Sequence, residues 1–355
     1  MARPRLEGIS FLRGISIFLV VVIHFIAGLP LQLFGHHEWQ PVFITFDQLG
    51  RVAVPIFLAA SGYLLGKKYS KDKHLDPKEF WLHRFQQILP LYIFWSVVLF
   101  GLRVMVPVWN QPPVDFSLFT IGKMLLFGQG DYHLYFVPLL LQMYLLYPLL
   151  RLLLARFPKP FLVFTFLIQA LLFIFIEQHT SSNTLPRFFQ SDGQQYLLFL
   201  NWWFYFVLGI FFVGREKSIR RFGLFWAGAT LVTGLLSAFD AYALIDGGRD
   251  PLFALRFTRL PILFYTSSFL FFAWSYLERL PQHTPPQLRS VFIRLGDNSF
   301  LVYLAHTIVL RLLLGIWYGQ IDWLTFTVGS LATLIALFLS FSWSSWTTWW
   351  STLRR

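Results

Sequence analysis

The sequence contains no cysteine and few charged residues. Without cysteine the chain can form no disulfide, no thiolate metal site and no catalytic thiol, so any covalent chemistry must use oxygen or nitrogen. Charged residues occupy 13% of the 355 positions, whereas soluble domains carry about 25%. Apolar residues make up 56% of the chain. Because so little polar material cannot cover a water-facing core, a soluble globular protein is excluded.

Several catalytic and binding motifs are also missing. The sequence has no G-x-S-x-G nucleophile elbow, no H-E-x-x-H zinc helix and no dinucleotide fingerprint. No histidine precedes an aspartate by five positions, as in soluble glycerolipid acyltransferases. The net charge of +12 is neither clustered nor joined to a groove-forming fold, so it does not indicate nucleic-acid binding. We predict no metal and no nucleic-acid partner.

Ten apolar runs are long enough to cross a bilayer as helices. They lie near residues 9 to 29, 42 to 65, 81 to 102, 133 to 154, 160 to 177, 196 to 214, 222 to 245, 259 to 277, 293 to 316 and 321 to 343. The first run is too long for a signal peptide, contains Arg13 and lacks a clear cleavage site, so it is predicted to be retained. The sequence therefore predicts a single all-α multi-pass domain over residues 1–355, a bundle of about ten transmembrane helices around a polar cavity.

Lysine and arginine gather in alternate loops, which predicts the orientation because cytoplasmic loops retain these residues. One side carries Arg3, Arg5, Lys67, Lys68, Lys71, Lys73, Lys78, Arg84, Arg151, Arg156, Lys159, Arg215, Lys217, Arg220, Arg221, Arg279, Arg289, Arg294, Arg354 and Arg355. Both termini are therefore predicted to be cytoplasmic. Arg249, Arg256 and Arg259 fit this pattern least. An interfacial anchor is predicted at Trp343, Trp346, Trp349 and Trp350.

Two charged or titratable residues of the first span carry most of the functional prediction. A charge at mid-bilayer costs at least about 2.5 kcal/mol and usually faces a cavity. Arg13 and His24 lie eleven residues apart, which is within about 20° of three full helical turns and a rise of roughly 16 Å. Both side chains are expected to face one cavity, Arg13 near the cytoplasm and His24 in the outer half.

The second and ninth spans contribute further polar residues. The ninth contains, in order, Asp297, Asn298, Ser299, Tyr303 and His306. The second contains Asp47, Arg51, Pro55, Ser61 and Gly62. Its proline frees the carbonyl four residues back, which survives in lipid only where packed protein or water satisfies it. We predict that the second span lines the same cavity.

These residues form two predicted layers. An inner layer offers cations and hydroxyls to a phosphorylated cytosolic donor: Arg13, Ser61, Arg84 and Asn298. An outer layer, on the side of the acceptor, consists of His24, His306, Asp47, Asp131, His133 and Tyr303. A neutral imidazole can remove a proton from a hydroxyl near neutral pH. Other readings stay open, because a histidine can simply bond a neighbouring helix and an arginine can be an anchor that extends to the interface.

The same residues resemble the membrane acyltransferase-3 family, multi-pass enzymes that O-acylate surface glycans and related acceptors. Arg13-Gly14 followed by His24 is similar to the family's signature of arginine, ten residues and histidine. Four further segments follow in the family's order: VPIFLAASGYLLG from Val54, HRFQQILPLYIFW from His83, HLYFVPLLLQMYLLYPLL from His133 and LGDNSFLVYLAH from Leu295. His83 stands where a second arginine is common, and Tyr135 replaces a frequent tryptophan.

The resemblance implies an acyl-coenzyme A donor, usually acetyl-coenzyme A, and a hydroxylated acceptor such as a sugar or lipid-linked glycan. We therefore expect an O-acyltransferase of the inner cell membrane, surrounded by membrane lipids, in which Arg13 holds the donor, His24 is the general base and His306 assists. Two alternatives stay open. One is a transporter or flippase that moves a polysaccharide or lipid-linked sugar without acyl chemistry, and the other is a structural subunit of an export complex.

The two histidines also give a geometric prediction. His24 lies fifteen residues from Ile9, and His306 lies thirteen residues from Ile293. A rise of about 1.5 Å per residue then places the histidines within about 3 Å of the same level. They are expected to face each other across the outer half of one cavity.

Overall fold

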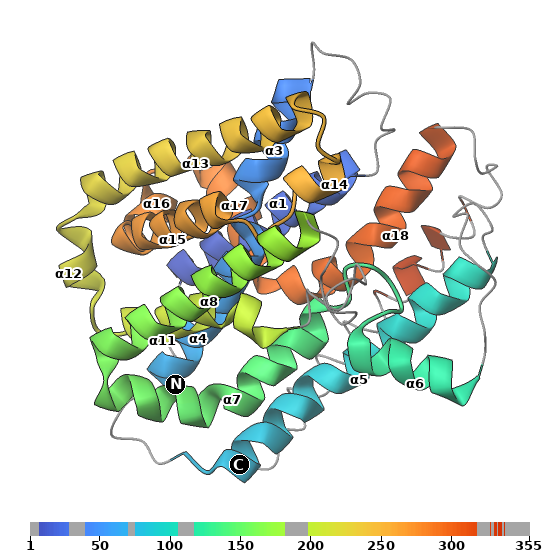
Figure 1. Ribbon diagram of the computed structural model, residues 1–355. Helices are drawn as coiled ribbons and strands as arrows, with labels where there is room; N and C mark the ends of the chain where they lie inside the picture. Colours follow the sequence, from blue (N-terminus) through green and yellow to red (C-terminus); the bar gives the residue numbers. More distant parts are fainter. Residues whose placement is uncertain are drawn as a thin grey trace. The chain divides into compact units, whose positions relative to one another are not determined.

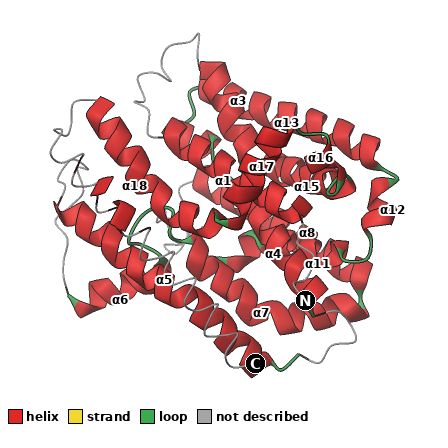
Figure 2. Cartoon of the chain, turned by 180° about the vertical axis from the view of Figure 1, so that it is seen from behind, coloured by secondary structure: helices red, strands yellow, loops and turns green. Residues whose placement is uncertain are grey.

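A computed structural model describes residues 7–27, 40–69, 75–105, 117–181 and 198–317, with a few further positions between 327 and 337. In this part of the chain every regular element is a helix (Figure 1). Figure 2 shows the same arrangement from behind, with helices joined by loops and turns. The all-α prediction is therefore confirmed for the described residues.

The helices and their bounds are as follows. They are α1 (Glu7–Ala27), α3 (Gln40–Gly50), α4 (Ala53–Lys68), α5 (Pro77–Met105), α6 (Leu118–Phe127), α7 (Phe136–Arg156), α8 (Pro158–Ser181), the 3-10 turn η2 (Phe199–Asn201), α11 (Trp203–Phe212), α12 (Glu216–Arg220), α13 (Gly223–Asp246), α14 (Pro251–Ala254), α15 (Leu260–Ser275), α16 (Arg279–Gln282), α17 (Pro286–Asp297) and α18 (Ser299–Trp317).

Seven helical segments of the described residues are long and apolar enough to cross a membrane. They are Glu7–Ala27, Gln40–Lys68, Pro77–Leu102, Phe136–Arg156, Pro158–Thr180, Gly223–Asp246 and Ser299–Ile316. Each overlaps one of the ten apolar runs of the sequence. The chain is therefore a multi-pass membrane protein.

The other three predicted spans do not correspond to described helices of membrane-spanning length. The run 196–214 contains only ten residues of α11 after η2, and ten residues rise about 15 Å, half of a hydrocarbon core of about 30 Å. The run 259–277 contains the sixteen-residue α15. Most of the tenth run, 321–343, lies outside the described residues, as do Trp343, Trp346, Trp349 and Trp350. The count of ten and the cytoplasmic termini stay predictions.

The second predicted span is interrupted where the sequence has a proline. Helix α3 ends at Gly50 and α4 begins at Ala53, so Pro55 lies in the first turn of α4. A proline costs nothing at this position, because the first N–H groups of a helix have no partner within it. The interruption therefore precedes the proline, and the amide of Arg51 bonds the carbonyl of Gln48 in a tighter turn.

The ninth predicted span is divided at Asn298. Helix α17 ends at Asp297 and α18 begins at Ser299. Both the backbone amide and the side-chain amide of Asn298 donate to the carbonyl of Arg294. A side chain that bonds the backbone in this way competes with helix continuation. The predicted helix 293–316 is therefore divided into α17 and α18.

The chain folds into two compact units, which we describe separately. Unit 1 comprises Met1–Leu75, Leu146–Ser191 and Leu198–Ser299. In it α1 packs on α17 and α4, α4 on α11, and α13 on α15. Two of these contacts depend on glycine: a Cβ on Gly14 would lie 1.9 Å from the carbonyl oxygen of Phe292, and a Cβ on Gly62 would lie 2.2 Å from that of Phe206. Such small residues let membrane helices approach closely.

Unit 2 comprises Asp76–Leu145, Asp192–Leu197 and Phe300–Arg355. Its described helices are α5, α6, the first half of α7 and α18. The hydroxyl of Tyr92 on α5 donates to the carbonyl of Leu125 on α6 at 2.7 Å. The indole of Trp81 on α5 donates to the carbonyl of Tyr144 on α7 at 3.2 Å. Aromatic side chains with polar tips thus join these helices.

Candidate active site

Arg13 and His24 lie on one face of α1, and this face is buried between them. Ile17 and Val20, which lie between the two on the same side of the helix, are 0% and 6% exposed. Arg13 and His24 themselves are half-buried. A guanidinium and an imidazole thus flank one apolar, covered strip of α1, about 16 Å apart along the axis.

The guanidinium of Arg13 is held at the junction of α17 and α18. Its Nη2 donates to the hydroxyl of Ser299 at 2.8 Å, and Ser299 is fully buried. One turn earlier on α1, the hydroxyl of Ser10 donates to Asp297 at 2.9 Å. The neighbouring Asn298 is exposed and bonds Arg294. Ser299 is thus one partner of Arg13, and the sequence prediction did not include it among the donor-binding residues.

The other two predicted donor-binding residues belong to different units. Ser61 lies half-buried on α4 of unit 1. Arg84 lies on α5 of unit 2, with its guanidinium 5.7 Å from the ring centre of Phe80 and 5.6 Å from that of Tyr144. Aromatic faces attract cations at such distances. That the four residues form one layer stays a prediction.

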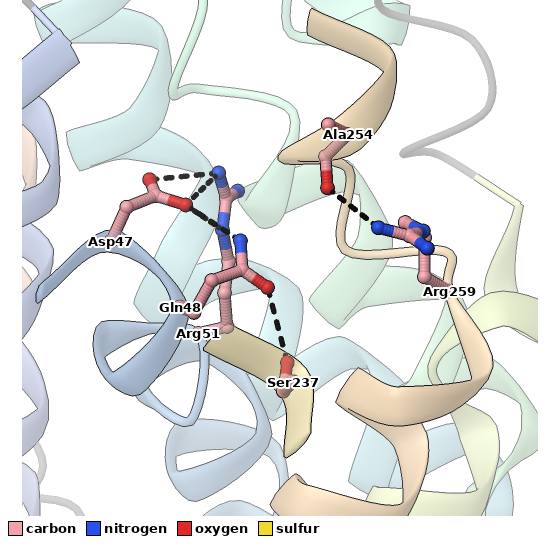
Figure 3. A network of polar contacts seen from close by, with 6 residues as sticks. All are labelled: Asp47, Gln48, Arg51, Ser237, Ala254 and Arg259. Carbon is pink, nitrogen blue, oxygen red and sulfur yellow. Dashed lines mark hydrogen bonds and ion pairs between the residues drawn. The ribbon is translucent and has the colours of Figure 1, made fainter. Parts of the chain in front are cut away.

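Asp47 takes part in a buried network of unit 1 (Figure 3). Its carboxylate accepts from Nε and Nη2 of Arg51, at 3.0 and 2.8 Å. It also accepts from the amide of Gln48 at 3.0 Å, and the oxygen of that amide accepts from Ser237 on α13 at 3.1 Å. The charge of Asp47 is therefore matched one helical turn away, and the network ties α3 to α13.

A second buried cation accounts for one of the three arginines that do not fit the charge pattern. Arg259, at the start of α15, is 5% exposed and donates to the carbonyl of Ala254 at 3.0 Å (Figure 3). It forms ion pairs with Asp240 on α13 and with Glu177 on α8. Arg259 is thus a packed structural residue of the segment 246–259. The preference of lysine and arginine for cytoplasmic loops concerns solvated charges, so it need not apply to this residue. This network could not be predicted from the sequence, since its members are far apart in the chain.

Four predicted acceptor-side residues meet in unit 2. The ring centres of His133 and His306 lie 5.0 Å apart, and those of His133 and Tyr303 lie 5.2 Å apart. The hydroxyl of Tyr303 donates to the carbonyl of His133. Nδ1 of His133 lies 3.7 Å from Oδ2 of Asp131. All four residues are buried. Two imidazoles, a carboxylate and a phenol therefore form one compact cluster.

The hydrogen bond of His306 determines its tautomer. Nδ1 lies 2.7 Å from the carbonyl oxygen of Tyr303. A carbonyl can only accept, so Nδ1 carries the hydrogen and Nε2 of the neutral ring is the acceptor nitrogen. An imidazole held in this way can receive a proton at Nε2.

Two residues of this cluster were missed by the sequence analysis. Thr307 donates to Oδ2 of Asp131 at 3.1 Å, and Arg311 donates to Oδ1 at 2.5 Å. The signal was present in the sequence, because Arg311 is a charged residue inside an apolar helix and lies eight positions after Tyr303, on the same side of α18.

His24 and His306 belong to different units, the first to unit 1 and the second to unit 2. His306 is the eighth residue of α18, not the fourteenth of one long helix, because of the division at Asn298. The estimate of a common level counted residues from Ile293 along one helix, whereas the structure has α17 and α18 there, and the common level stays a prediction. That the two histidines face each other across one cavity stays a prediction.

Comparison with known proteins gives one match. A family model described as an acyltransferase domain, that of the acyltransferase-3 family, matches residues 6–349, which is nearly the whole chain. No curated protein and no solved structure matches the chain. The matched stretch includes Arg13, His24 and the cluster around His306. The chain therefore belongs to the membrane acyltransferase-3 family.

Proposed function

We propose that the protein is an O-acyltransferase that moves an acyl group, acetyl in the simplest case, from cytosolic acyl-coenzyme A to a hydroxyl of a glycan or similar acceptor. The observation that carries the proposal is the pairing of Arg13 and His24 on one buried face of α1. The family is that of acyltransferases, and these two residue types supply what acyl transfer to a hydroxyl requires: a group that binds phosphate and a group that accepts a proton.

The roles follow from the chemistry of the side chains. A planar guanidinium binds phosphate oxygens in a bidentate manner, which suits the phosphates of coenzyme A, and Ser299 holds the guanidinium of Arg13 in place. His24 takes the proton of the acceptor hydroxyl. The hydroxyl oxygen then forms the new bond to the acyl carbon, the carbon–sulfur bond of the thioester breaks, and the proton passes to the departing thiolate.

His306 assists as a second imidazole. Its neutral ring presents Nε2 as an acceptor, because Nδ1 is bonded to Tyr303. Burial keeps this group out of bulk water, which strengthens its electrostatic interactions. The inner cell membrane is the proposed location, since it gives access to cytosolic coenzyme A and to surface glycans. A transporter without acyl chemistry is not favoured, because the family match is to acyltransferases.

The experiment uses the full chain purified into lipid nanodiscs. Radiolabelled acetyl-coenzyme A is supplied with a panel of mono- and oligosaccharide acceptors, and both free coenzyme A and labelled acceptor are measured. We expect the two products in equal amounts with the wild-type protein and neither with His24→Ala at the same amount of folded protein. Movement of a sugar across a vesicle membrane with no acylated product would support the transporter instead.

A further inference from the structure

Asp131, in the turn between α6 and α7, has a buried carboxylate that has no role in the reaction proposed above. Oδ1 of Asp131 accepts from the backbone amide of Tyr132 at 2.7 Å and from Arg311 at 2.5 Å. Oδ2 accepts from Thr307 at 3.1 Å and faces Nδ1 of His133 at 3.7 Å. The carboxylate is thus fixed through both oxygens, with one of them directed at an imidazole.

Three residues of α18 hold this turn from a single ridge. Tyr303, Thr307 and Arg311 are spaced four apart and therefore lie above one another on the helix. Tyr303 bonds the carbonyl of His133, while Thr307 and Arg311 bond Asp131. The result is that the ring of His133 lies edge-on to that of His306, with an angle of 75° between the planes.

An anionic oxygen at this distance stabilises positive charge on an imidazole, and it does so more strongly when both are buried. The separation of 3.7 Å is longer than a hydrogen bond but short enough for an ion pair. The second imidazole of the cluster is in contact with the first. A proton that reaches His306 therefore enters a pair of rings with a carboxylate oxygen 3.7 Å from Nδ1 of His133.

We propose that Asp131 is a positioning residue for acyl transfer: held by Arg311 and Thr307, it orients His133 and stabilises positive charge on the His133–His306 pair. This inference rests on the proposed acyltransferase function. In the proposed reaction His24 takes the hydroxyl proton as the acceptor oxygen bonds to the acyl carbon. His306 receives this proton, which the His133–His306 pair shares until it passes to the thiolate that is released when the carbon–sulfur bond breaks. In this proposal Arg311 and Thr307 act through Asp131.

A different result is expected if the Asp131–Arg311 pair only joins the turn to α18 and has no role in acyl transfer. Breaking a buried ion pair by removing one partner is strongly destabilising, whereas replacing both partners by neutral groups of similar shape is often tolerated. A structural pair would therefore be restored by the double replacement in both stability and activity. A pair that supplies charge to the imidazoles would regain stability alone.

The first experiment compares Asp131→Asn, Arg311→Gln and the double variant with the wild-type protein in nanodiscs. Melting temperature, kcat and the KM for acetyl-coenzyme A are measured for each. We expect both single variants to lose stability and activity, and the double variant to regain melting temperature while its kcat stays at least about tenfold low with an unchanged donor KM. Recovery of kcat together with stability would overturn the inference.

A milder pair of variants tests the same point without touching a charge. Thr307→Val keeps the shape of the side chain but removes the hydrogen bond to Oδ2, and Thr307→Ser retains it. The hydroxyl of Thr307 is one of the donors that fix Asp131, so kcat should fall by roughly tenfold in the valine variant and recover in the serine variant. Equal kcat in the valine variant and the wild-type protein would overturn the inference.

The matched control is Thr230→Val on α13 of unit 1. The hydroxyl of Thr230 bonds only its own helix in the contact that the structure shows, the carbonyl of Trp226 at 2.7 Å, so kcat should not change. The activities of the wild-type protein and the double variant also distinguish a failure of the proposed acyltransferase function from a failure of the role proposed for Asp131. If the wild-type protein transfers no acyl group at all, the proposed function is wrong and this inference falls with it. If it does and the double variant is as active, only the role of Asp131 is wrong.

Discussion

Gly14→Ala should separate α1 from α17 and so disturb the proposed donor site. A Cβ at this position would lie 1.9 Å from the carbonyl oxygen of Phe292, whereas ordinary contact begins at 3.4 Å. The difference means that the helices must move apart by roughly 1.5 Å. The opposing oxygen and carbon belong to the backbone, so no side-chain rotation can relieve the overlap.

The displacement acts on Arg13, the adjacent residue. Its hydrogen bond to Ser299 is 2.8 Å long, and an added shift of roughly 1.5 Å would exceed hydrogen-bonding distance. A misplacement of about 1 Å in a binding group can cost about a hundredfold in rate. Overpacking also costs about 1 to 3 kcal/mol of stability. We expect kcat/KM for the acyl donor to fall about a hundredfold, with a lower melting temperature.

The assay measures coenzyme A release against donor concentration, with the amount of folded protein matched by size-exclusion chromatography. Gly228→Ala on α13 is the control, because a Cβ there meets nothing within 4 Å. Alanine is also the better helix former by about 1 kcal/mol. The reasoning is refuted if folded Gly14→Ala protein has the donor kcat/KM of the wild type.

Three further substitutions test the other networks. Arg259→Met removes the cation that Asp240 and Glu177 share. These carboxylates are 38% and 34% exposed, so the cost should lie between about 1 kcal/mol and the roughly 3 kcal/mol at which buried pairs begin. Arg220→Met, which breaks an exposed pair, should cost at most about 1 kcal/mol, and thermal unfolding in detergent compares the two variants. Arg13→Lys keeps the charge but loses the planar fork, so donor affinity measured by titration calorimetry should fall, and loss of acceptor affinity alone would contradict its assignment. His24→Ala should abolish acyl transfer at a normal protein level, and near-normal turnover would remove this residue from the mechanism.

The long helices could be predicted because apolar runs of membrane-spanning length carry a strong signal. The positions at which helices begin, end or divide inside such runs could not be predicted. The run 196–214 is apolar on all sides, so hydropathy gives no indication that helix begins only at Trp203 of α11. At the division, the side-chain amide of Asn298 bonds the carbonyl of Arg294. This is a local contact within a run that hydropathy treats as uniform.

The candidate residues could be found as polar groups inside apolar runs, but their partners could be found only when close in sequence. Asp47 and Arg51 are four residues apart, which is a readable helical pair. Asp131 and Arg311 are 180 residues apart, and no periodicity in one sequence joins them. Intramembrane charge is therefore an indication of a site or of a buried ion pair, and the structure adds partners that are distant in sequence, such as Arg311 for Asp131.

The far end of α1 provides the last test, because a second glycine contact lies next to His24. A Cβ on Gly50 of α3 would lie 2.7 Å from Cγ1 and 2.8 Å from Cδ1 of Ile23, and 4.0 Å from the carbonyl oxygen of Leu19. The crowded atoms here end a flexible side chain, which can change rotamer at a cost of about 1 kcal/mol. We therefore expect Gly50→Ala to keep acyl transfer within about threefold of the wild type, in contrast to the loss expected for Gly14→Ala. Equal losses in the two folded variants would show that the whole of α1 shifts as one body, and that backbone contact at Gly14 has no special part in holding Arg13.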